Sequence, residues 1–115
     1  MKVGIVRDPL YLEHSNGAGH PERGERLEMI DSMLSRFDRA GELEEIPARD
    51  ATREELGRVH SERHIRAVER SRGEGFTMFT MDTFATSGSF DAAVRAAGGV
   101  ISAVEAMPTA APPGQ

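Results

Sequence analysis

The chain has 115 residues, 38% hydrophobic and 29% charged, which is the balance of one globular domain or part of one. The absence of cysteine excludes disulfides and thiolate chemistry, and a net charge of -5 with a single lysine argues against a surface that neutralises nucleic-acid phosphates. No apolar run approaches the roughly 20 residues of a membrane span, and the apolar stretch at the start of the chain is too short for a secretory signal. We therefore expect a cytoplasmic protein without nucleic-acid or membrane partners.

The first residues predict a short buried strand followed by an unusual loop. Lys2 to Arg7 combine β-branched residues with a glycine, and Asp8-Pro9 ends the strand. The stretch from Leu10 to His20 has no periodicity and is rich in polar side chains and glycines. Loops of this kind carry function more often than cores do, so this stretch is the first candidate for a site.

A helix is predicted from Pro21 to about Arg39. Proline suits the first helical turn, and acidic residues follow it where the helix dipole favours them. The apolar residues recur every three or four positions, which gives one stripe: Leu27, Ile30, Leu34 and Phe37. A weaker pattern over residues 44–48 predicts a second strand.

Two short helices follow, each with a recognisable start. Thr52 and Glu55 have the spacing of a capping box, which predicts a helix to about Val59. Ser61 is placed to cap another helix that ends near Gly73. Residues 75–88 are irregular and predict either a strand or a long loop.

The clearest helix is predicted from Ser89 to Met107. It has an apolar stripe and a second face of small residues, so we expect one of the two faces to remain partly uncovered. Gly98 and Gly99 each cost about 1 kcal/mol relative to alanine in a helix interior, which indicates that another backbone packs closely there. We expect residues 1–107 to form one unit, and residues 108–115, with three prolines, to be a disordered tail.

Several side chains are candidates for chemistry, and each has a structural alternative. His60 and His64 have the spacing of a two-histidine metal site, but Ser61 between them favours a surface or capping role. His14 and His20 could serve acid–base chemistry, or could hold the loop by bonding its backbone. Asp82 stands among apolar residues and is either a turn residue or a charged group that lines a site.

Three blocks, taken together, resemble the histone deacetylase and acetylpolyamine amidohydrolase superfamily. The first runs from Tyr11 to Arg26 and contains His20-Pro21-Glu22; the second is Val59-His60-Ser61; the third runs from Asp82 to Gly99. Their order and spacing cover nearly the whole chain, which makes the resemblance specific.

The resemblance implies an α/β fold, namely the N-terminal part of a three-layer arginase/deacetylase-like architecture, mostly helical here with one or two short strands. Asp82 matches the rim aspartate that binds the backbone of the acetylated substrate. Arg26 matches an arginine of the internal acetate channel, and His20 and Pro21 match the loop that shapes the mouth of the pocket.

The resemblance also implies that catalysis needs residues outside this chain. Residues 112–115, Pro-Pro-Gly-Gln, resemble the start of a Pro-Pro-Gly-His-His motif that supplies general-base histidines, and the Asp, His and Asp metal ligands lie further on in the family. We therefore expect no catalytic or metal-binding residue in the chain. It should act as an inactive N-terminal part of a deacetylase that uses zinc or another divalent metal, with the rest of the domain and an acetylated protein or small molecule as partners. The alternative is a non-catalytic module that binds a partner through the same helices.

Overall fold

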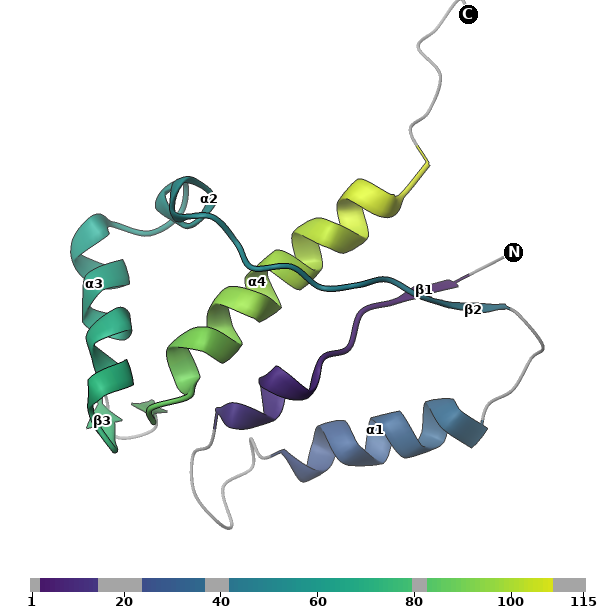
Figure 1. The fold of residues 1–115 in the computed structure, drawn as a ribbon, viewed down its shortest axis with the longest axis horizontal. Coiled ribbons are helices and arrows are strands. Elements are labelled where there is room, and N and C mark those ends of the chain that lie inside the picture. The colour runs from purple at the N-terminus through teal and green to yellow at the C-terminus, as the bar shows by residue number, and fades with distance from the viewer. Residues whose placement is uncertain (1–2, 15–23, 37–41, 80–82, 109–115) are drawn as a thin grey trace, which may run out of the picture.

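The computed structural model describes residues 3–14, 24–36, 42–79 and 83–108. The long helix α4 (Ser89–Ala106) crosses the centre of the molecule. The strands β1 (Val3–Ile5) and β2 (Leu43–Glu45) lie on one side of it, and the helices α2 (Arg53–Gly57) and α3 (Glu62–Arg70) lie on the other (Figure 1). In chain order the elements before α4 are β1 (Val3–Ile5), the 3-10 helix η1 (Pro9–Glu13), α1 (Glu25–Arg36), β2 (Leu43–Glu45), α2 (Arg53–Gly57), α3 (Glu62–Arg70), the 3-10 helix η2 (Ser71–Gly73), β3 (Thr77–Met78) and β4 (Phe84–Ala85).

The two predicted strands near the N-terminus are confirmed, although both are shorter than predicted. The prediction that the first strand is buried is wrong, because Val3 and Gly4 are exposed and Ile5 is half-buried. β1 and β2 pair in parallel, with Val3 opposite Leu43 and Ile5 opposite Glu45. Parallel neighbours need a long crossover, which α1 and its flanking segments supply. The pairing is the parallel arrangement that an α/β fold requires.

The loop predicted to start at Leu10 is wrong over its first residues, which form η1. Asp8 caps this helix by accepting a hydrogen bond from the Leu10 backbone nitrogen at 2.9 Å, and Pro9 occupies the first turn. The Asp8-Pro9 pair predicts the end of a strand, yet the same pair is also typical of a helix start.

Helix α1 is confirmed over its described part, residues 25–36, whereas Pro21 and the predicted end at Arg39 lie outside the described residues. None of its residues is buried, and Leu27, Met29, Ile30 and Met33 are all exposed. A pocket of about 710 Å³ separates its apolar side from β1 and η1. Of the predicted apolar stripe, Leu27 and Ile30 are exposed and Leu34 is half-buried, whereas Phe37 lies outside the described residues.

The two predicted caps in the middle of the chain are confirmed. Thr52 and Glu55 form a complete capping box at the start of α2, and the Ser61 hydroxyl accepts a hydrogen bond from the His64 backbone nitrogen at 3.1 Å at the start of α3. The segment from residue 75 to 88, predicted as a strand or a loop, contains the antiparallel pair β3 and β4.

The close backbone approach predicted at Gly98 and Gly99 is confirmed at Gly98, whereas the close neighbours of Gly99 are side chains. A Cβ atom on Gly98 would overlap the Arg49 carbonyl oxygen and lie 2.6 Å from the Ala51 backbone nitrogen, and one on Gly99 would lie 2.5 Å from the Tyr11 hydroxyl. The Ala51 nitrogen also donates a hydrogen bond to the Val94 carbonyl at 3.0 Å. The extended segment after β2 therefore lies directly on α4.

Charged side chains add a second connection between α4 and the segments beside it. Arg95 donates to Asp50 at 2.7 Å and to Asp8 at 2.8 Å. The Leu10 backbone N–H and the Arg95 guanidinium both lower the pKa of Asp8 from its ordinary value. One arginine thus holds together η1, the segment after β2, and α4.

The hydrophobic core of the described residues is small. Its buried apolar members are Ala51, Ile65, Ala85, Phe90 and Ala92. One face of α4 is uncovered, as its two-faced pattern predicts, with Val100 66% and Val104 62% exposed. Within the described ranges, no helix is long and apolar enough to cross a membrane.

We predict that Gly98→Ala destabilises the protein by about 1–3 kcal/mol, because the new methyl group would meet backbone atoms that cannot rotate away. Urea unfolding monitored by circular dichroism measures this difference. Gly57→Ala is the matched control, because no atom beyond its chain neighbours and its own helix backbone lies within 4 Å of a Cβ added there. Equal stability of the two variants would contradict the close packing.

A second prediction concerns the bidentate pair in which Arg49 donates to both carboxylate oxygens of Glu55 at 2.8 Å. This pairing, with the Thr52 backbone N–H, lowers the pKa of Glu55 from 4.5 to about 2. The stabilisation is present above about pH 4.5 and is lost as the pH falls towards about 2, because the unfolded state takes up the proton first. Glu55→Gln should therefore lower stability at pH 7 and flatten the acid limb of the stability curve.

Urea unfolding between pH 7 and pH 2 tests this dependence. Glu54→Gln is the control, because that neighbouring side chain is 85% exposed and lies 3.7 Å from Arg58. In this control the free energy of unfolding should fall with pH as steeply as in the wild type. A weaker pH dependence in the control would contradict the prediction that Glu55 causes the effect.

Candidate functional site

A cluster of polar groups joins the end of η1 to the start of α4. The His14 Nδ1 atom lies 2.7 Å from the Ser89 hydroxyl oxygen, although the two residues are 75 positions apart. The Thr86 backbone nitrogen donates to the same oxygen at 2.8 Å, and the Thr86 hydroxyl donates to the Glu13 carbonyl at 3.3 Å. Ser89 is 5% exposed, so the two bonds to its hydroxyl are partly shielded from water, whereas the bond from Thr86 to Glu13 is exposed.

The backbone at this cluster is as closely packed as the side chains. A Cβ atom on Gly88 would lie 2.8 Å from both the carbonyl oxygen and the Cβ atom of Glu13. The end of η1 therefore rests directly on the turn that starts α4. Gly88 is the residue before α4, and Ser89 is its first helical residue, as the sequence predicts.

The distance between His14 and Ser89 is that between a nucleophile and its general base, but the environment of the pair differs from that of a catalytic serine. A reactive serine needs an accessible hydroxyl and a base that a third group orients. Here the Ser89 oxygen is buried and already accepts the Thr86 N–H, and no hydrogen bond to the other ring nitrogen of His14 is present among the described residues. We conclude that the pair is structural. Among the described residues, the His14 ring bonds this distant side chain, and most of the loop whose backbone it could hold lies outside the described residues.

The residues predicted for substrate binding are within a few sequence positions of His14 or Thr86. His20, Pro21 and Asp82 are outside the described residues. The described chain before His20 ends at His14, and the described chain after Asp82 resumes at Thr83. Arg26 is described, and it lies exposed near the start of α1.

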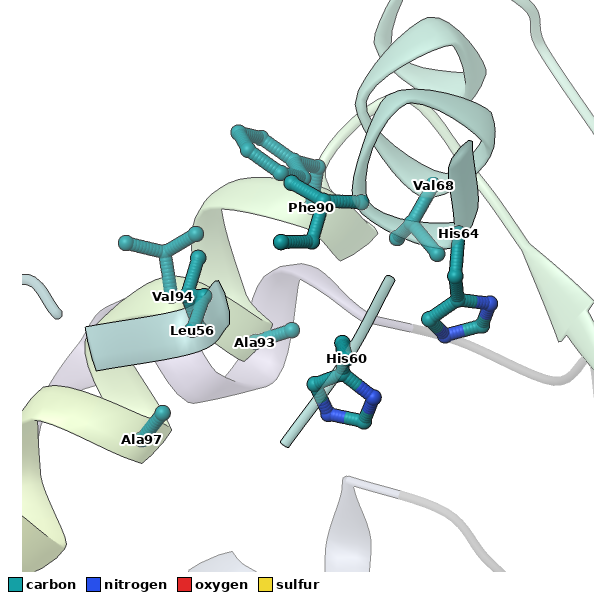
Figure 2. A pocket seen from close by; sticks show the side chains of 9 residues that line it. Leu56, His60, His64, Val68, Phe90, Ala93, Val94 and Ala97 are labelled. Atoms are coloured by element: carbon teal, nitrogen blue, oxygen red, sulfur yellow. The ribbon is translucent and has the colours of Figure 1, made fainter. Parts of the chain in front are cut away.

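A small apolar pocket lies where α2 and α3 meet α4. Its volume is about 130 Å³, and it is lined by Leu56, His60, His64, Ile65, Val68, Phe90, Ala93, Val94 and Ala97. Figure 2 shows the imidazole rings of His60 and His64 next to each other, with centroids 5.1 Å apart. Phe90 is buried, and the Arg72 guanidinium lies over its ring, 4.9 Å from the centroid.

The two histidines do not make a metal site in the described structure. Ser61 caps α3 between them, so they do not share one continuous helix, which agrees with the predicted surface role. Within residues 3–14, 24–36, 42–79 and 83–108, no group of three or more histidine, aspartate or glutamate side chains could hold a metal ion.

Comparison with known proteins agrees with the family that the sequence blocks resemble. The sequence profile described as "Histone deacetylase domain" matches residues 20–111. A probable deacetylase of Archaeoglobus fulgidus is 36% identical over 110 residues, which cover 93% of this chain and 30% of that protein. Histone deacetylase 15 of Arabidopsis thaliana is 39% identical over 80 residues, which cover 69% of this chain and 14% of that protein.

The fold agrees as well. The crystal structure of the HDA15 HD domain matches with a TM-score of 0.75 at 37% identity, over 85% of this chain and 29% of that one. The α/β fold predicted as the N-terminal part of an arginase/deacetylase-like architecture is thereby confirmed. The chain spans less than a third of the length of these relatives, and it belongs to the histone deacetylase domain family.

Proposed function

We propose that this chain is the N-terminal part of a metal-dependent deacetylase and supplies the pocket rim and scaffold of its active site. The observation that carries the proposal is the 36% identity to a probable deacetylase over 93% of this chain but only 30% of that relative. The reaction would be hydrolysis of the amide bond in an acetyl-lysine side chain or an acetylpolyamine. Without the rest of the domain, the chain would be inactive.

The uncovered apolar surface supports this view. Soluble domains cover most large apolar faces, and a wide uncovered patch marks a contact surface. Here the exposed side chains lie on α1, at Met29 and Met33, and on α4, at Val100 and Val104. The rest of a deacetylase domain is the partner that we propose for these faces.

The residue roles in this proposal follow the family pattern. Asp82 would bind the backbone of the substrate, His20 and Pro21 would shape the mouth of the pocket, and Arg26 would line the acetate channel. The exposed position of Arg26 on α1 is compatible with a channel wall that the rest of the domain completes. Zinc or another divalent metal would be held by residues outside this chain, in a protein that we expect in the cytoplasm.

Activity of the full-length protein tests the proposal. We expect it to deacetylate an acetyl-lysine peptide or an acetylpolyamine, to lose this activity with a metal chelator, and to show none as the isolated 115-residue chain. Asp82→Ala should raise KM about 10- to 100-fold, because hydrogen bonds to a charged group contribute about 1.5–3 kcal/mol. Release of acetate measures the rates.

Glu74→Ala is the control for charge loss, because Glu74 is an exposed acidic residue outside the proposed site. Chelator-sensitive activity in the isolated chain would contradict the predicted inactivity. An inactive full-length protein that forms a stable complex with another protein would favour the alternative, a non-catalytic binding module.

A further inference from the structure

We propose that the pocket between α2, α3 and α4 binds small carboxylates that carry one apolar group, either aromatic or branched aliphatic. The apolar group would occupy the pocket, and the carboxylate would lie between His60 and His64 at its rim. The residues of this pocket have no part in the proposed function, and the proposal does not depend on deacetylase activity.

The body of the pocket is apolar and has the size of one small ring. Ile65 of α3 and Phe90 of α4 are both buried and form two of its walls, and Leu56 of α2 is half-buried and forms a third. The volume of about 130 Å³ is close to the roughly 150 Å³ of an engineered apolar cavity that binds benzene. A phenyl ring or a branched chain of similar size therefore fits.

Two imidazole rings stand together at one end of this pocket. Figure 2 shows His60 and His64 next to each other, with the apolar side chains of Leu56, Phe90 and Val94 on the other side of the view. The ring centroids are 5.1 Å apart, and the ring planes are inclined by 37°. Within the part of the chain that the structure describes, no side chain forms a hydrogen bond with either ring. The nitrogens of both exposed rings are thus available to a ligand.

The charges around the two rings favour an anion. His60 and His64 are the only titratable groups among the described residues that line the pocket, and α4 contributes apolar side chains alone. The carboxylates of the three surrounding helices each form an ion pair with an arginine, in the pairs Glu54–Arg58, Glu55–Arg49, Glu62–Arg53, Glu69–Arg53, Asp91–Arg72 and Glu105–Arg49. The rings therefore have no carboxylate of these helices as a counter-ion, and a ligand can supply one.

A carboxylate fits this arrangement because each of its two oxygens can accept an N–H from one of the rings. Histidine gains its positive charge as the pH falls through about 6.5, and two adjacent imidazolium rings repel each other unless an anion lies between them. Hydrogen bonds between an imidazolium and a carboxylate are also stronger than those between neutral groups. We therefore expect the ligand to bind more tightly at low pH.

The experiment measures dissociation constants in the full-length protein with three probes. Benzoate has both the ring and the charge, benzamide has the ring alone, and acetate has the charge alone. Methyl NMR follows Ile65 and Val68, because the ring current of a bound phenyl group shifts nearby methyl signals. We expect benzoate to bind with a Kd of about 1–10 mM at pH 5.5 and about 3- to 10-fold more weakly at pH 8. Benzamide binding should not change with pH, and acetate should leave both methyl signals in place.

Two sets of variants assign the binding to this pocket. His60→Gln and His64→Gln keep a polar side chain without the charge, so the double variant should lose the pH dependence of benzoate binding and still bind benzamide. Ala93→Leu adds bulk at an exposed position that lines the pocket and should weaken benzoate binding about 5-fold or more. Ala96→Leu is the matched control, because Ala96 is an exposed alanine of the same helix that is not among the lining residues.

Several results would overturn the proposal. Equal benzoate affinity at pH 5.5 and pH 8, or an unchanged pH dependence in the double histidine variant, would contradict the role of the rings. Benzoate binding that Ala93→Leu leaves unchanged would place the ligand elsewhere. Binding by the isolated 115-residue chain but not by the full-length protein would show that the rest of the protein covers the pocket. A full-length protein that binds benzoate as expected but shows no deacetylation would contradict the proposed function and support this proposal.

Discussion

The close approach of α4 to the segment at Arg49 and Ala51 is the constraint on which the described fold depends. Gly98 allows backbone to meet backbone there, Gly99 leaves room for the Tyr11 side chain, and the Ala51 N–H donates to the Val94 carbonyl beside them. Each glycine in a helix interior is about 1 kcal/mol less favourable than alanine, so the packing and hydrogen bonding at this contact must stabilise the fold by more than the two glycines destabilise it. The segment after β2 is thereby fixed against α4 although it has no regular structure.

Ion pairs connect the elements that the small hydrophobic core does not hold together. Few apolar side chains are buried, so arginine pairs connect elements that would otherwise touch only at their edges. Arg95 reaches Asp8 and Asp50, and Arg49 reaches Glu55 of α2 with a bidentate geometry. Each exposed ion pair of this kind contributes little to the free energy of unfolding. The planar bidentate geometry and the shared partners nevertheless fix the relative orientation of the groups that they join. They determine where the segments lie more than how stable the whole is.

Features with local causes were predictable from the sequence, and those with distant causes were not. The capping box at Thr52 involves residues three apart, and its prediction was confirmed. The glycines predicted that some backbone would approach α4, but not that it would be the segment near Arg49, half the chain away. The bond between His14 and Ser89 spans 75 positions and has no local signal. η1 was missed because Asp-Pro is typical of both a strand end and a helix start.

For the candidate site, the sequence predicted the family, and the comparisons confirmed it, while the roles of individual residues stay predictions. Asp82, His20 and Pro21 lie outside the described residues, as do residues 109–115 of the predicted tail, and Arg26 is exposed. What the structure adds is the connection between the stretches that flank them. The buried Ser89 hydroxyl makes this connection, because it contacts both His14 and Thr86 although His14 lies 75 positions away in the sequence.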